Sequence, residues 1–173
     1  MKKQLACLLG TSALALMLGT QAHALDGNIE IAGSSESTMV YGLGLKWDFN
    51  REWWQSERGH LTGHWDAAYR YWDGDDSSGM HSVSLTPMFV YEFHRAGIRP
   101  YLEAGVGASL LSKTRYEGRS FGIAFNFVSH IGAGLKLSPQ QSIGIRANHY
   151  SNASIKQPND GIESYSLYYR FGF

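Results

Sequence analysis

Hydrophobic and polar residues alternate along most of the chain. Between Met39 and Phe49 the odd positions carry large apolar side chains, whereas glycine, lysine and aspartate occupy most of the even positions. Because successive side chains of an extended chain point to opposite faces, a period of two is typical of a β-strand. The same pattern predicts eight strands, over residues 29–31, 39–49, 61–72, 82–93, 101–110, 121–137, 143–147 and 165–173.

The two faces of the predicted strands differ in composition. One face is apolar and rich in Tyr, Trp and Phe. The other face combines glycines with carboxylates and bases in similar numbers: Glu30, Asp48, Asp66, Glu92, Glu103, Lys46, Arg70, Lys136 and Arg146. Small side chains and balanced charges suit the interior of a narrow eight-stranded barrel whose aromatic face meets lipid.

We therefore predict an all-β fold, an eight-stranded antiparallel transmembrane β-barrel in the outer membrane of a Gram-negative bacterium. A closed barrel leaves no strand edge unpaired in lipid. The alternative is a soluble β-sandwich. A sandwich would place its polar face in water, where Lys, Glu and Thr are expected rather than the glycines found here.

The first 24 residues have the pattern of a secretory signal peptide. Two lysines precede an apolar run over residues 5–18, and a small-residue cleavage pattern ends at Ala24. We predict cleavage after Ala24, which leaves residues 25–173 as a single barrel domain. The single cysteine, Cys7, lies in the removed segment. The mature chain would therefore be held by packing and backbone pairing without a disulfide.

Composition excludes two classes of protein. The 15 basic and 15 acidic residues give no net positive charge, so a nucleic-acid-binding surface is not expected. Aromatic residues make up 13% of the chain, far more than a disordered protein carries.

The connections between strands fall at two ends of the predicted barrel. If both termini face the periplasm, the connections at 33–38, 73–80, 112–120 and 152–162 lie outside the cell, and the other three are periplasmic turns.

Three polar residues occupy positions where lipid-facing apolar side chains are expected. His149 and Ser151 continue the outward face of the seventh strand, and Glu163 begins that of the eighth. The strand from Glu163 to Phe173 spans about 34 Å, or about 26 Å of depth at a tilt near 40°. The apolar band of such barrels is about 25 Å tall. All three residues are therefore predicted at the outer leaflet.

The types of these three side chains suit acyl transfer. A hydroxyl nucleophile needs a base to take its proton, and an imidazole base needs a carboxylate to orient it. We assign Ser151 as nucleophile, His149 as base and Glu163 as the orienting carboxylate. The alternative is that these are ordinary polar residues at the membrane interface, in contact with headgroups.

The segment His149-Tyr150-Ser151-Asn152, with Glu163 downstream, resembles the outer-membrane lipid A 3-O-deacylases of the PagL type. Four further stretches support the resemblance, at residues 41–45, 61–67, 90–93 and 131–136. The resemblance implies an enzyme that hydrolyses the ester-linked acyl chain at position 3 of lipid A in the outer leaflet. Its Ser-His-Glu triad falls on Ser151, His149 and Glu163.

The resemblance has further implications for the site and its partners. It implies that Asn152 helps to form the oxyanion hole, and Asn159 is a candidate for holding the same loop. Lipid A and outer-membrane lipid are the expected partners, a homodimer is possible, and no metal or cofactor is implied. The chain departs from the family at Ser154, where a glycine is expected, and at Ser129, where an aspartate is expected.

Two other functions use a similar barrel: a lipid A acyltransferase, and a non-enzymatic structural or adhesive protein. A transferase would need an acyl-measuring pocket inside the barrel, whereas this interior is predicted to be charged. Four loop cations are candidates for binding lipid A phosphates or are ordinary solvated residues: Lys113, Arg115, Arg119 and Lys156.

Overall fold

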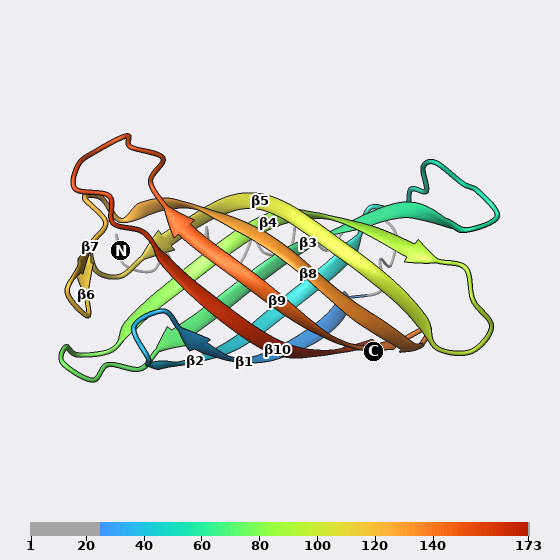
Figure 1. Cartoon of the computed structure of the whole chain (residues 1–173), viewed down its shortest axis with the longest axis horizontal. Coiled ribbons are helices and arrows are strands. Elements are labelled where there is room, and N and C mark those ends of the chain that lie inside the picture. The colour runs from blue at the N-terminus through green and yellow to red at the C-terminus, as the bar shows by residue number, and fades with distance from the viewer. Residues whose placement is uncertain (1–24, 173) are drawn as a thin grey trace, which may run out of the picture.

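Residues 25–172 form a closed antiparallel barrel in the computed structural model (Figure 1). The eight barrel strands follow the order β1-β10-β9-β8-β5-β4-β3-β2. The predicted fold class is thus confirmed, and the alternative, a β-sandwich, is excluded. The predicted signal peptide and Phe173 lie outside the residues that the structure describes. None of the described residues belongs to a helix with the length and hydrophobicity needed to cross a membrane.

The strands agree with the alternation pattern, with differences at their ends. Their bounds are β1 Leu25–Ser34, β2 Met39–Asp48, β3 Gly59–Trp72, β4 Met80–Phe93, β5 Arg99–Leu111, β6 Arg115–Tyr116, β7 Arg119–Ser120, β8 Phe125–Ser138, β9 Gln141–Ser151 and β10 Ile162–Gly172. β1 is longer than its weak alternation suggested, because it pairs with both β2 and β10 along its length. β8 begins at Phe125 rather than at residue 121, because Gly122 has a φ of +69° that interrupts the extended chain.

The connections gather at two ends of the barrel, as predicted. One end, here called the hairpin end, holds loops 35–38, 73–79, 112–124 and 152–161 together with the small hairpin of β6 and β7. The other end, here called the C-terminal end, holds loops 49–58, 94–98 and 139–140. Figure 1 shows the label C at the end opposite β6 and β7.

The two faces of the barrel wall have opposite character. Outward side chains are large and apolar, and those of Ile131 and Ile145 are 68% and 63% exposed. Inward side chains form the predicted charged interior: Arg146 lies 2.7 Å from Glu103 and 3.1 Å from Asp66, and Arg70 lies 2.9 Å from Glu30. Buried ions are tolerated only when they are paired and hydrogen-bonded, so this network explains how a narrow barrel can be filled with charge.

An apolar cluster fills the interior at the hairpin end. Trp72, Tyr116 and Tyr150 are buried in it, and the Trp72 and Tyr150 rings meet edge to face with centroids 5.2 Å apart. Because side chains alternate across a strand, an inward Tyr150 requires its neighbours His149 and Ser151 to point out of the barrel. The interior packing therefore determines which way the candidate site faces.

Candidate active site

Two of the predicted site residues meet on the outer surface of the barrel at the hairpin end. His149 on β9 and Glu163 on β10 are directly paired across the two strands. The Nδ1 atom of His149 lies 2.8 Å from Oε1 of Glu163. The two side chains are 47% and 38% exposed. Register and alternation together bring the imidazole and the carboxylate into contact.

This contact fixes the roles of the two imidazole nitrogens. A carboxylate only accepts hydrogen bonds, so Nδ1–H of the neutral His149 ring donates to Glu163. The Nε2 atom then keeps its lone pair and can accept a proton. A Cβ atom added at Gly161 would lie 3.0 Å from Cε1 of His149. The loop backbone at Gly161 therefore packs closely against this side of the ring.

Ser151 is the last residue of β9 and lies on the same outward face as His149. Its side chain is half-buried, and its Cα pairs with Phe127 of β8. The Ser151 hydroxyl has no hydrogen-bond partner among residues 25–172. Catalytic hydrogen bonds often tighten only when substrate is bound, so this position is compatible with transfer of the hydroxyl proton to His149.

The backbone of Glu163 is hydrogen-bonded to loop 35–38, which follows β1, the strand that pairs with β10 to close the barrel. Ser35 N–H donates to the carbonyl oxygen of Glu163 at 3.0 Å, and Glu163 N–H donates to the Ser35 hydroxyl at 3.3 Å. Sequence analysis did not single out Ser35. Its role arises because β1 and β10 are neighbours only once the barrel has closed.

Asn152 fastens the loop that follows the candidate nucleophile. Its side-chain Nδ2 donates to the carbonyl oxygens of Phe121 and Lys156 at 2.6 and 2.7 Å. Its backbone N–H donates to the Asn159 carboxamide oxygen at 2.8 Å. The Asn152 side-chain and backbone nitrogens are therefore already engaged within the protein, and Asn159 contacts the same loop.

The backbone of the next two residues of this loop is left-handed. Ala153 and Ser154 have φ values of 50° and 63°. Ser154 thus adopts a conformation that favours glycine, the residue expected here from the family resemblance. Neither the Ala153 nor the Ser154 N–H donates a hydrogen bond within the described part of the chain. These two N–H groups follow Ser151 by two and three residues along the chain.

An apolar groove begins directly beside the His149–Glu163 pair on the outer wall. The groove measures about 630 Å³ and runs along β8, β9 and β10. Outward side chains line it: Ile131, Ala133, Ile145, Ala147, Tyr165 and Leu167. Ala147 and Tyr165 are two residues from His149 and Glu163 along their strands. An aliphatic chain lying in this groove would reach the candidate site.

The sequence profile of the lipid A 3-O-deacylase (PagL) family matches residues 39–172. The chain belongs to this family. The family resemblance found in the sequence is thereby confirmed, and with it the assignment to a family of enzymes.

Individual relatives extend over nearly the whole chain. The lipid A deacylase PagL of Pseudomonas aeruginosa is 48% identical over 97% of this chain and 98% of its own length. The lipid A deacylase PagL of Bordetella bronchiseptica is 35% identical over 96% of this chain and 95% of its own length.

Solved structures agree with the sequence comparison. The crystal structure of the outer membrane enzyme PagL superimposes with a TM-score of 0.83 and 50% identity, covering 86% of this chain and 99% of that one. A designed transmembrane β-barrel superimposes with a TM-score of 0.55 at 11% identity, which concerns the fold alone. The barrel and its relatives indicate a protein of the Gram-negative outer membrane.

The structure divides the four loop cations of this family member into two kinds. Lys113 donates to Ser78 and Arg119 pairs with Glu36, so both already have partners in neighbouring loops. Arg115 and Lys156 are exposed and form no ion pair among residues 25–172. These two cations are the ones whose charge is available to a ligand.

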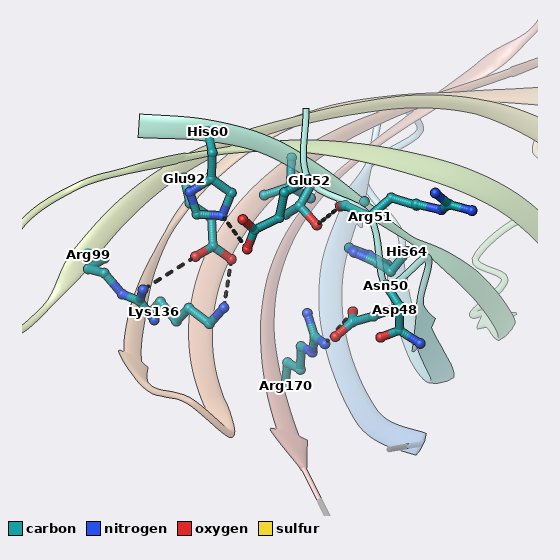
Figure 2. A pocket seen from close by; sticks show the side chains of 13 residues that line it. Asp48, Asn50, Arg51, Glu52, His60, His64, Glu92, Arg99, Lys136 and Arg170 are labelled. Carbon is teal, nitrogen blue, oxygen red and sulfur yellow. Dashed lines mark hydrogen bonds and ion pairs between the residues drawn. The ribbon is translucent and has the colours of Figure 1, made fainter. Parts of the chain in front are cut away.

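A second cavity lies inside the barrel at the C-terminal end, far from this site. Figure 2 shows its polar walls, which enclose about 400 Å³. Lys136 lies 2.6 Å from Glu92, and Arg170 lies 3.1 Å from Asp48. Sequence analysis did not single out Arg170, although its even position in the last strand placed it inside. Because its acids and bases pair with one another, this cavity continues the interior charge network.

Among residues 25–172, no group of three or more His, Cys, Asp or Glu is arranged to hold a metal ion.

Proposed function

We propose that this protein is a serine esterase that hydrolyses the ester-linked acyl chain at position 3 of lipid A. The observation that carries the proposal is the His149–Glu163 hydrogen bond on the lipid-facing wall, with Ser151 on the same face and an apolar groove beside it. The names of the family and of the relatives from Pseudomonas aeruginosa and Bordetella bronchiseptica support lipid A as the substrate.

The first half of the reaction forms an acyl-enzyme. Ser151 Oγ attacks the ester carbonyl while His149 Nε2 takes the hydroxyl proton. Glu163 holds the ring in the tautomer that exposes Nε2 and stabilises the imidazolium. The tetrahedral intermediate then expels the sugar oxygen, which receives the proton from His149.

The second half releases the fatty acid. Water attacks the acyl-enzyme as His149 takes its proton, and the collapsing intermediate returns that proton to Ser151 Oγ. Negative charge develops on the carbonyl oxygen in both halves and needs fixed donors. We assign this role to the N–H groups of Ala153 and Ser154, which have no partner within the described part of the chain, with Asn152 and Asn159 holding their loop.

The lipid-facing position of the site defines the geometry of binding. The acyl chain to be removed lies in the groove along β8, β9 and β10, and the sugar remains at the rim. With both termini in the periplasm, the hairpin end is at the outer leaflet, where lipid A resides. The charge-filled interior, with Lys46, Asp66 and Arg146 buried, argues against an internal acyl-measuring pocket of the kind a transferase barrel needs.

Mass spectrometry of lipid A tests this proposal. The full chain and its Ser151→Ala and His149→Ala variants are expressed in a Gram-negative host. We expect the unsubstituted chain to remove one 3-hydroxyacyl group and both variants to leave lipid A intact. Glu163→Ala should retain more activity than either, because solvent can partly replace the carboxylate as a hydrogen-bond partner of His149.

Heat-modifiable gel migration, which reports a closed barrel, should be retained by all three variants. Deacylation by Ser151→Ala at the rate of the unsubstituted chain would overturn the mechanism. Purified protein and lipid A in detergent provide the same comparison outside the membrane. An unsubstituted chain that is inactive there as well would favour a structural or adhesive barrel.

A further inference from the structure

A chain of buried polar side chains lies directly behind the candidate site, on the inner face of the same strands. His130 on β8 pairs with Asn148 on β9, and Asn148 pairs with Ser164 on β10. Asn148 directly precedes His149 along β9, and Ser164 directly follows Glu163 along β10. The inner chain and the outer site therefore share the same rungs of the barrel.

Hydrogen bonds run continuously through this inner chain. The Nδ1 atom of His130 lies 2.6 Å from Oδ1 of Asn148, and Asn148 Nδ2 donates to the Ser164 hydroxyl at 3.0 Å. On the other side, His130 Nε2 lies 3.2 Å from the Thr86 hydroxyl on β4. All four side chains are at most 5% exposed, so water does not compete for these bonds.

The donor and acceptor of each hydrogen bond in the inner chain follow from the chemistry of its side chains. The Asn148 carbonyl oxygen only accepts, so Nδ1 of His130 carries the proton. In the neutral ring Nε2 then accepts from the Thr86 hydroxyl. The Thr86 hydroxyl thus donates to His130, His130 donates to Asn148, and Asn148 donates to Ser164.

The inner chain of hydrogen bonds passes over β5, and no side chain of β5 takes part in it. A Cβ atom added at Gly107 would lie 2.2 Å from the Thr86 hydroxyl, and one added at Gly105 would lie 3.0 Å from the Thr86 methyl group. These glycines leave the space through which β4 and β8 make contact. The inner chain therefore joins β4, β8, β9 and β10 across a sector of the wall that has the candidate site on its outside.

We propose that His130, Asn148 and Ser164 are positioning residues for the triad. Their hydrogen bonds fix the position of β9 along its axis relative to β8 and β10, and so hold His149 of β9 level with Glu163 of β10. A displacement of about 1 Å at a reacting group can cost on the order of a hundred-fold in rate. The inference rests on the proposed esterase function and adds residues that touch neither substrate nor triad.

The test compares variants of the inner chain with a matched control. Asn148→Leu and Ser164→Ala remove hydrogen bonds of the inner chain. Asn148→Asp preserves it, because a carboxylate accepts from both His130 and the Ser164 hydroxyl. Ser109→Ala is the control: Ser109 on β5 is equally buried and donates a hydrogen bond to the Val83 carbonyl oxygen at 3.1 Å, outside both the inner chain and the apolar cluster around Tyr150.

Two rates are measured for each protein in detergent, after heat-modifiable migration has established that the barrel is closed. One is deacylation of lipid A. The other is labelling of Ser151 by a fluorophosphonate, which needs no lipid. We expect Asn148→Leu and Ser164→Ala to lower kcat and the labelling rate by roughly ten-fold or more, with KM changed by less than about two-fold. Asn148→Asp and Ser109→Ala should stay within about three-fold of the unsubstituted protein.

Two results would overturn the inference. One is that Asn148→Leu and Ser164→Ala are no slower than Ser109→Ala, and the other is that Asn148→Asp is as slow as Asn148→Leu. Either result with an active unsubstituted chain leaves the esterase proposal standing. An unsubstituted chain that neither deacylates lipid A nor is labelled at Ser151 removes both proposals together.

Discussion

At the scale of single residues, the candidate site depends on close approach as well as on the three reactive groups. The imidazole of His149 is hydrogen-bonded to the Glu163 carboxylate, and it lies so close to Gly161 that a Cβ atom added there would be 3.0 Å from its Cε1 atom. Gly161 has a φ of +68°, which L side chains rarely adopt. A glycine at this position therefore serves both the turn of the loop and the placement of the ring.

Gly161→Ala is predicted to lower activity more than stability alone would explain. Its Cβ would meet the His149 ring at 3.0 Å, whereas a Cβ at Gly97 would meet nothing within 4 Å. Both glycines are left-handed, with φ values of +68° and +77°, so both alanine variants should lose roughly 1–2 kcal/mol of unfolding free energy. Urea unfolding and kcat should separate them, with a large loss of kcat confined to Gly161→Ala. Equal kcat values in the two variants would contradict the close-packing argument.

At the scale of elements, the β6–β7 hairpin ties the loops of its end together. Arg119 pairs with Glu36 of loop 35–38 at 2.7 Å. Ser120 exchanges hydrogen bonds with Asp160 of loop 152–161, through its N–H to the carboxylate and through its carbonyl oxygen to the Asp160 N–H. Glu117 reaches loop 73–79. One short hairpin thus braces the loop that carries the proposed oxyanion donors.

The hold of Glu117 on loop 73–79 should persist into acid. The Ser77 hydroxyl donates to its carboxylate at 2.7 Å, and the N–H groups of Asp76, Ser77 and Asp75 donate as well. These hydrogen bonds lower the pKa of Glu117 from 4.5 to about 2. Since the folded pKa is the lower one, the stabilisation is complete above about pH 4.5 and is lost as pH falls through 2.

Amide NMR of the detergent-solubilised protein measures this dependence. The Ser77 amide shift should titrate with a midpoint near 2, and Glu117→Gln should remove the transition. A midpoint near 4.5 would mean that the carboxylate is not held by the loop in solution.

At the scale of the whole molecule, the barrel wall encloses charge rather than hydrocarbon. Arg146 lies at the centre of this interior, bonded to Glu103 and Asp66, and its side chain is fully buried. Removing one member of a buried ion network leaves the remaining charges uncompensated, at a cost of about 3–5 kcal/mol. An exposed pair contributes about 1 kcal/mol or less.

Arg146→Met should therefore destabilise the barrel far more than Arg99→Met. Arg99 is half-buried at the C-terminal end and lies 3.8 Å from Glu92, which also binds Lys136. Urea unfolding in detergent, followed by the gel shift between folded and unfolded forms, should show a loss of several kcal/mol for Arg146→Met and a small change for Arg99→Met. Similar midpoints for the two variants would mean that the interior network adds little to stability.

Much of the site could be predicted because it depends on local periodicity. Alternation is a property of each strand by itself, so the sequence determined that His149, Ser151 and Glu163 share the outward face. Antiparallel pairing of consecutive strands then put His149 beside Glu163, as the register bears out. The same alternation of odd and even positions predicted that the charged side chains would face the interior of the barrel.

The tertiary structure decided whatever depends on residues distant in sequence. Phe121 has outward parity but turns into the apolar cluster, and Asn152 uses its nitrogens to bind Phe121, Lys156 and Asn159. Ser35 reaches Glu163 only because closure makes β1 and β10 neighbours. A strand's faces are set by its own backbone geometry, whereas loop contacts and interior hydrogen bonds exist only after the ends of the sheet have met.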